Sequence, residues 1–287
     1  MGGERGKRML RRILVAGLIA LGFPAPSRAE LKVVDIRPTY GRLGSTRPST
    51  RVLPGEDFHV AFVVSGISRG TDGRSEVSTS AELLDEAGEI VAQVPGSPGR
   101  VFLALGGNSL PRHVHFSLPL DFAPGKYKVR GVCTDVRTGD EVTVEQPFEV
   151  APLEFGIVRL RLAGDAEGKT AVGGNLTVSQ EVHVVGRGVG FARKGERIHV
   201  VGNLTIRDAG GKPVVPNPIS FEIDQEVDDD LDQLDFRWTL PVNRAGKFSL
   251  LIEVRDEIAG KDASYEMPLV VSVPPSLEKP RVNTGKR

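Results

Sequence analysis

The arrangement of apolar and polar positions along the chain has a period of two. In residues 125–135, every second residue belongs to one apolar or small set, namely Tyr127, Val129, Gly131 and Cys133. This period is typical of a β-strand with one face in a core. Short runs of this kind recur along the chain between clusters of Gly, Pro and Asp, as they do in sandwiches and barrels. The pattern predicts an all-β protein without a long amphipathic helix after residue 30.

One segment of this kind occurs twice. GKYKVRGVCTDVRTGDEVTVEQPFEV spans residues 125–150, and GKFSLLIEVRDEIAGKDASYEMPLVV spans residues 246–271. The two align without a gap, and their glycines and aspartates coincide at Gly125/Gly246, Asp135/Asp256 and Gly139/Gly260. Asp and Gly are favoured in hairpin loops. Each segment is therefore predicted to be a strand, a turn and a strand.

The similarity continues upstream. The matching positions are His59/His183, Gly66/Gly190, Gly88/Gly210 and Phe116/Trp238. Their constant order and an offset of about 120 residues indicate a duplicated domain, because this is the usual size of one domain and exceeds the period of solenoid repeats. The predicted domains are residues 31–151 and 153–273.

The repeat also settles two local ambiguities. Residues 81–87 could form a helix on their own, but their counterpart, residues 203–208, has the composition of a strand, so a strand is predicted. Ala151-Pro152-Leu153 is a short joint containing a proline, which predicts a fixed or narrowly hinged pair of domains. Residues 274–287 are rich in proline and basic residues and are predicted to be a disordered tail.

The segment APGKYKVRGVCTDVRTGDEVTVEQPFEV, residues 123–150, resembles the last two strands of bacterial immunoglobulin-like domains. The resemblance implies two tandem Ig-like Greek-key β-sandwiches, a fold used in spacers, adhesion units and assembly modules. It also implies a tyrosine corner at Tyr127, where a hydroxyl bonds back to the main chain. The second copy has Phe248 at this position and cannot make that bond.

Residues 1–29 have the form of a secretory signal peptide. A basic segment precedes the apolar run ILVAGLIALGF, and small residues at Ser27 and Ala29 predict cleavage after Ala29. The alternative is a membrane anchor, but the run is about half the roughly 20 residues that a spanning helix needs. We expect a secreted or periplasmic protein of the cell envelope, without a membrane span after cleavage.

Removal of this leader changes the charge. The precursor has 37 basic and 37 acidic residues. Without residues 1–29 there remain 31 basic and 36 acidic residues, a net charge of about −5, and no basic stripe suited to nucleic acid. Cys133 is the only cysteine, so an internal disulfide is excluded and apolar burial must supply the stability. This fits a bacterial envelope.

An acidic run, residues 224–235, is the most unusual local composition. Its carboxylates Asp228, Asp229, Asp230 and Asp232 are a candidate Ca²⁺ site, because Ca²⁺ takes 6–8 oxygen ligands. The run lacks the glycine and spacing of an EF-hand loop, and its counterpart, residues 106–111, has no carboxylate. The alternative is a solvated loop, in which case no cofactor is expected.

The remaining candidates favour structural roles. His113 and His115 lie on one side of a predicted strand but lack a third ligand at a motif spacing, and His199 is isolated in the sequence. Cys133 aligns with Val254 and is predicted to be a buried, inert hydrophobic residue. No group of nucleophile, base and orienting residue is found, so the protein is not expected to be an enzyme.

The sequence therefore predicts a non-enzymatic spacer or protein-interaction module with an envelope or extracellular protein as its partner. Any partner is expected at the loops that differ between the copies, such as residues 69–74 and the acidic run. Two alternatives remain open: a module that binds carbohydrate or calcium, and an accessory or inhibitor subunit of a secreted enzyme. The only tryptophan, Trp238, is expected in the core and not on a sugar-binding face.

Overall fold

The computed structural model describes residues 29–274. The predicted leader (residues 1–29, but for Ala29) and the predicted tail lie outside the described residues. Residues 29–274 contain strands and turns but no helix, and the all-β prediction is confirmed. In this part of the chain no helix has the length and apolar character needed to cross a membrane.

The first half contains nine strands. These are β1 (Lys32–Thr39), β2 (Arg51–Val52), β3 (Asp57–Ser65), β4 (Arg74–Leu84), β5 (Ile90–Val94), β6 (Gly99–Phe102), β7 (Ser109–Ser117), β8 (Gly125–Asp135) and β9 (Glu141–Val150). One sheet has the order β1-β3-β7, and the other has the order β2-β9-β8-β4-β5, with β6 also pairing with β4.

The second half contains eight strands. These are β10 (Gly156–Ala163), β11 (Asn175–Thr177), β12 (Glu181–Val189), β13 (Arg197–Asp208), β14 (Ile219–Glu226), β15 (Gln233–Pro241), β16 (Gly246–Asp256) and β17 (Lys261–Ser272). The sheets have the orders β10-β12-β15 and β11-β17-β16-β13-β14. With β6 set aside, both halves have the same strand order.

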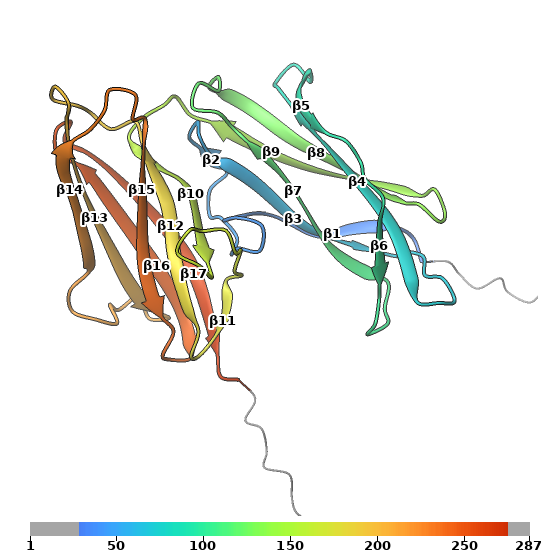
Figure 1. The fold of residues 1–287 in the computed structure, drawn as a ribbon. Helices are drawn as coiled ribbons and strands as arrows, with labels where there is room; N and C mark the ends of the chain where they lie inside the picture. Colours follow the sequence, from blue (N-terminus) through green and yellow to red (C-terminus); the bar gives the residue numbers. More distant parts are fainter. Residues whose placement is uncertain (1–28, 275–287) are drawn as a thin grey trace, which may run out of the picture.

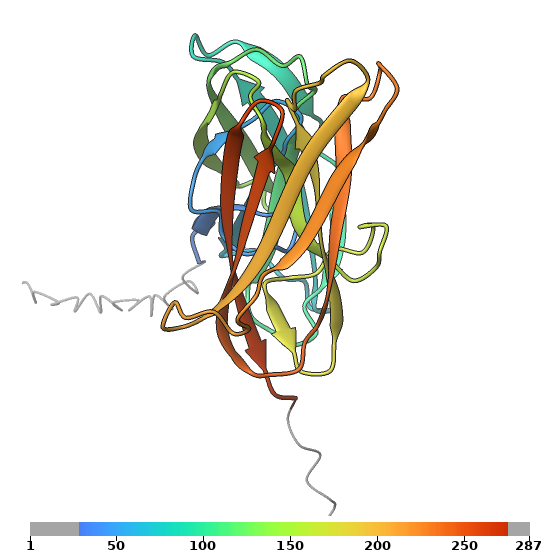
Figure 2. The same cartoon turned by 90° about the vertical axis from the view of Figure 1, so that its left-hand side faces the viewer.

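The halves lie side by side and are joined between β9 and β10 (Figure 1). Turned by 90°, the long strands of the second half stand in front of the first half (Figure 2). In each half, alternate residues of both sheets meet in one apolar cluster. Along β3, for example, Phe58, Val60, Phe62 and Val64 are buried and the residues between them are partly exposed. The apolar face of each sheet is thus removed from water against the other sheet, which is the main source of stability.

The repeated segments form β-hairpins, β8–β9 and β16–β17. Each hairpin begins its turn at a buried aspartate that fastens a distant loop. Asp135 accepts hydrogen bonds from the backbone nitrogen (2.6 Å) and hydroxyl (2.8 Å) of Ser68. Asp256 accepts one from the backbone nitrogen of Ala192 at 2.7 Å. Because these donors are satisfied by a buried carboxylate, the two aspartates fix the same loop in both halves.

A β-bulge also recurs in both halves. The register of β1 against β3 shifts between Val34 and Arg37, and that of β10 against β12 shifts between Val158 and Arg161. Within the bulges, Asp35 and Arg159 have φ angles of 56° and 53°, a region that side chains other than glycine seldom occupy. The same irregularity at the same place is a structural mark of duplication.

The structure corrects the pairing of some repeat positions. His59 lies opposite His115, and His183 lies opposite Thr239, so the counterpart of Trp238 is Val114 and not Phe116. The turn bonds of the halves likewise equate Gly88 with Gly211 and not with Gly210. A slip of two residues keeps a side chain on the same face of a strand, and Trp238 is buried in the core as predicted.

The strand predicted over residues 81–87 is confirmed for residues 81–84, which lie in β4. Residues 85–87 instead belong to the turn before β5, which is closed by hydrogen bonds of Asp85 with Gly88 and Glu89.

The other predictions for these elements are confirmed. The Tyr127 hydroxyl donates to the Ala123 carbonyl oxygen at 2.9 Å, which is the expected corner. In the second half the guanidinium of Arg244 lies over the Phe248 ring, 5.1 Å from its centroid. Cys133 and Val254 are both buried. Burial raises the pKa of the Cys133 thiol, which makes it unreactive.

Replacing Cys133 by valine should therefore lower the free energy of unfolding by less than about 1.5 kcal/mol, as near-isosteric core changes do. Val254→Cys is the matched change in the other half and should have a similarly small effect. Urea denaturation measures both variants, and a thiol reagent should leave Cys133 unlabelled in the folded protein. Rapid labelling would contradict a core role for this side chain.

Candidate functional site

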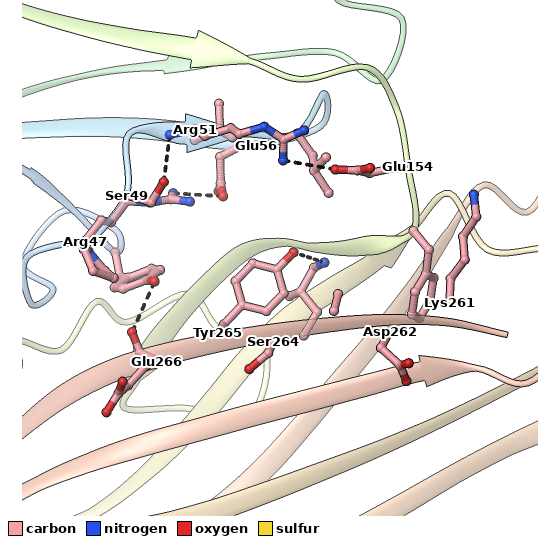
Figure 3. A pocket seen from close by; sticks show the side chains of 17 residues that line it. Arg47, Ser49, Arg51, Glu56, Glu154, Lys261, Asp262, Ser264, Tyr265 and Glu266 are labelled. Atoms are coloured by element: carbon pink, nitrogen blue, oxygen red, sulfur yellow. Dashed lines mark hydrogen bonds and ion pairs between the residues drawn. The ribbon is translucent and has the colours of Figure 1, made fainter.

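A cavity lies where the two halves meet. It has a volume of about 590 Å³ and is lined by residues of the segment between β1 and β3, of the connection to β10, and of β17. Figure 3 shows Arg47, Arg51 and Glu56 on one side of this groove, facing Tyr265 and Glu266 on the other. We call it the junction groove.

A buried ion pair lies beside the junction groove. Arg47 and Glu56 are 2.9 Å apart, and their side chains are only 6% and 4% exposed. The other oxygen of Glu56 accepts a hydrogen bond from the backbone nitrogen of Arg159, in the β10 bulge, at 2.8 Å. The Arg159 side chain also donates to the Gly55 carbonyl oxygen at 3.0 Å. Glu56 thus connects the first half to the main chain of the second.

Two tyrosines extend this network. The Arg47 guanidinium lies over the Tyr40 ring, 4.9 Å from its centroid, and the Tyr40 hydroxyl donates to the Glu266 carbonyl oxygen at 3.3 Å. The Tyr265 hydroxyl accepts a hydrogen bond from the backbone nitrogen of Ile157 at 2.8 Å. Burial raises the pKa of Tyr265 to about 12, so this phenol stays neutral. Its role is structural and not that of a base.

Close packing completes the contact between the halves. Leu53 and Leu120 of the first half contact an apolar cluster with Ala151, Val158 and Val189. A Cβ atom on Gly156 would lie 2.5 Å from Leu53 and 2.7 Å from the Tyr265 hydroxyl, so a larger residue there would displace these side chains. The joint predicted from Ala151-Pro152-Leu153 is therefore reinforced by a packed interface.

The rim of the junction groove is charged and solvated. Arg51 and Glu154 form an ion pair at 3.1 Å, with both side chains about half exposed. Lys261, Asp262 and Glu266 of β17 line the same rim and are exposed. This arrangement can accept a polar peptide segment or a charged side chain of a partner. The lining residues include no paired nucleophile and base suited to covalent chemistry.

The acidic run spans the end of β14 and the loop to β15. Asp228, Asp229 and Asp230 are exposed, as is Asp232. The Arg193 guanidinium donates to the backbone carbonyl oxygens of Asp228 and Leu231. The positive charge of Arg193 thus already lies against main-chain oxygens of this loop. The Ca²⁺ site remains a prediction.

His113 and His115 point away from the core of the first half. The His115 ring stacks on His59 with 5.0 Å between centroids, and the His113 ring lies 6.2 Å from that of His115. Burial, followed by the neighbouring His115, lowers the pKa of His59 to about 4. Within the described part of the chain the Nδ1 atom of His59 is buried and has no hydrogen-bond partner. The three rings thus form a stack, and they are not among the side chains of the described residues whose donor atoms meet closely enough to share a metal ion.

Sequence analysis missed His199. This residue, isolated in the sequence, lies opposite Asp224 in the β13–β14 pair, and its Nε2 atom is 2.8 Å from a Glu222 oxygen. The hairpin register brings the imidazole onto the first carboxylate of the acidic run. Because the connection between β13 and β14 is long and irregular, the sequence alone does not set the register that pairs these residues.

No protein-family model and no curated protein matches the chain. Among solved structures, a chain titled BspA_C_WT has a TM-score of 0.29 and 12% identity, over 82% of this chain and 99% of that one. The BspA C-terminal domain of a Streptococcus agalactiae AgI/II polypeptide has a TM-score of 0.28, 12% identity and the same coverages. The alkylpurine DNA glycosylase AlkC of Pseudomonas fluorescens, bound to DNA with an abasic site analogue, has a TM-score of 0.29 and 13% identity, over 42% of this chain and 30% of that one. Likenesses this weak carry no inference about function.

Replacing Glu56 by alanine should lower the free energy of unfolding by about 3–5 kcal/mol, because it leaves the buried Arg47 charge uncompensated. Urea denaturation followed by tryptophan fluorescence measures this loss. Glu154→Ala breaks the exposed pair on the same groove and should cost less than about 1 kcal/mol. Equal effects of the two changes would contradict the role given to Glu56.

The stability should also fall at acidic pH because of His59. The unfolded chain binds this proton near pH 6.5 and the folded protein only near pH 4. The contribution of neutral His59 is therefore complete above about pH 6.5 and is lost as the pH falls toward 4. The melting temperature of His59→Gln should depend less on pH across this window than that of the wild type. Parallel curves for the two proteins would refute this assignment.

Proposed function

We propose that this protein is a non-enzymatic module of the bacterial cell envelope, in which two immunoglobulin-like sandwiches form one rigid unit that binds another protein. The observation on which the proposal most depends is the buried contact between the halves. Arg47, Glu56 and Arg159 are linked across it at 2.8–2.9 Å. A flexible spacer would not need such a contact, whereas a binding module with a fixed geometry does.

The immunoglobulin-like assignment is supported by the strand order. In each half a three-stranded sheet faces a larger sheet, and the chain passes between the two sheets several times. The larger sheet contains two hairpins, which are β4–β5 and β8–β9 in the first half. Short strands β2 and β11 pair in parallel with the last strand of their half. These features, with the Tyr127 corner, match the general plan of such sandwiches.

Export is supported by the signal-like residues 1–29. Association with a protein is favoured over carbohydrate binding because Trp238 is only 4% exposed and cannot serve as a stacking platform. The charged rim of the junction groove and the unequal loops are the proposed contact surfaces. An accessory subunit of a secreted enzyme is compatible with the same surfaces.

Rigidity of the unit can be measured by spin labelling. In a Cys133→Val background, cysteines at Ser97 and Lys212, which are exposed in different halves, should give one narrow distance distribution by double electron–electron resonance. A pair within the first half, at Ser97 and Asp121, gives the reference width. A distribution between the halves that is much broader than this reference would overturn the proposal of a rigid unit.

A further inference from the structure

Three metal-binding side chains meet on the outer face of β13 and β14. His199 lies directly opposite Asp224 in this antiparallel pair, and Glu222 is two residues from Asp224 on the same strand. Side chains two apart on a strand share a face. The neighbouring residues Ile198 and Val200 point into the core, so the three polar groups are directed outward.

Their donor atoms are close enough to share one ion. One nitrogen of His199 and one oxygen each of Glu222 and Asp224 lie within 4.8 Å of one another. Small rotations about side-chain bonds would bring them to ~2.0–2.2 Å from a common centre, the distances found for Zn²⁺ with nitrogen and oxygen ligands. The register of β13 and β14 sets the spacing of the three side chains.

The chemistry of the donors selects the class of metal. An imidazole with two carboxylates suits Zn²⁺ and similar transition-metal ions. Ca²⁺ prefers 6–8 oxygen ligands and makes little use of nitrogen. This trio therefore differs in kind from the calcium site predicted in the loop that follows β14.

Arg197 is the competitor for this site. Its guanidinium donates to both oxygens of Asp224, at 2.7 and 2.6 Å. Arg197 is 60% exposed and pairs in register with Glu226, so a displaced guanidinium has another carboxylate nearby.

The first half lacks this trio at the equivalent place. The counterpart of His199 is Glu76, because Val77 pairs with Asp135 as Val200 pairs with Asp256. Glu76 forms an ion pair with Arg100 at 3.3 Å. The duplicated frame therefore carries an ordinary ion pair in one copy and three ligand side chains in the other.

We propose that His199, Glu222 and Asp224 form a binding site for one Zn²⁺ ion or a similar transition-metal ion, with its remaining coordination position open to solvent. The site lies on the edge strand β14, where a ligand from a partner or from water can complete the coordination. The site does not involve the junction groove. Its test is therefore separate from the test of the proposed function.

Isothermal titration of the untagged protein with ZnCl₂ tests the site. We expect saturable binding of one ion that excess Ca²⁺ does not displace. His199→Ala and Glu222→Gln should each weaken it more than about tenfold, since removal even of outer-shell partners costs 10–100-fold. Arg197→Ala should strengthen binding, because it removes the competing cation from Asp224.

Two variants serve as matched controls. Glu253→Gln removes the same charge from an exposed position of β16, which pairs with β13 away from the site, and His115→Ala removes an exposed imidazole from the other half. Both should leave the affinity within about twofold, and circular dichroism should show unchanged folding in every variant. Absence of saturable binding, an unchanged affinity in His199→Ala, displacement by Ca²⁺, or an equal loss in Glu253→Gln would each overturn the proposal.

Discussion

The carboxylate of Glu56 is the group on which the arrangement of the two halves depends. It is buried, and its oxygens are taken by the Arg47 guanidinium at 2.9 Å and by the Arg159 backbone nitrogen at 2.8 Å. A buried charge is tolerated only when it is fully paired. Any rotation of one half against the other would break one of these bonds, so the network favours a single orientation. The apolar contact of Leu53 and Leu120 with the second half stabilises the association of the halves. The bonds of Glu56 fix their relative orientation.

Most of the fold could be predicted because its determinants are local or repeated. The period of two identified strands, and the duplication showed that residues 81–84 belong to a strand and that Cys133 belongs to the core. At Phe116 and Trp238 the alignment of the copies was wrong by two residues. An even slip preserves the face of a strand, so burial was still predicted correctly. Local periodicity is thus robust against small errors in register.

The sites were harder to predict because they depend on contacts between distant residues. Glu56 and Arg159 are 103 positions apart, and neither stands out among the 74 charged residues of the chain. His199 and Asp224 meet only through the register of β13 and β14, which the irregular connection between these strands conceals. The acidic run is conspicuous by its composition. The proposed metal site, however, uses only its first residue, Asp224, together with His199 and Glu222, which precede the run. Composition indicates which groups are present, whereas the pairing of strands decides which of them meet.

The β-bulge that occurs once in β1 and once in β10 affects how such domains can be joined end to end. A contact that joins the end of one domain to the start of the next can in principle repeat without limit and give a filament. Here Arg159 in the second bulge corresponds to Asp35 in the first. Gln180 occupies the place of Glu56, because Val242 bonds to its carbonyl oxygen as Leu118 bonds to that of Glu56. At the outer ends of the molecule, the Gln180 amide therefore takes the place of the Glu56 carboxylate. Likewise, the Asp35 carboxylate takes the place of the Arg159 guanidinium. After duplication the two halves have diverged, so the outer ends lack the pair of groups that forms the contact between the halves.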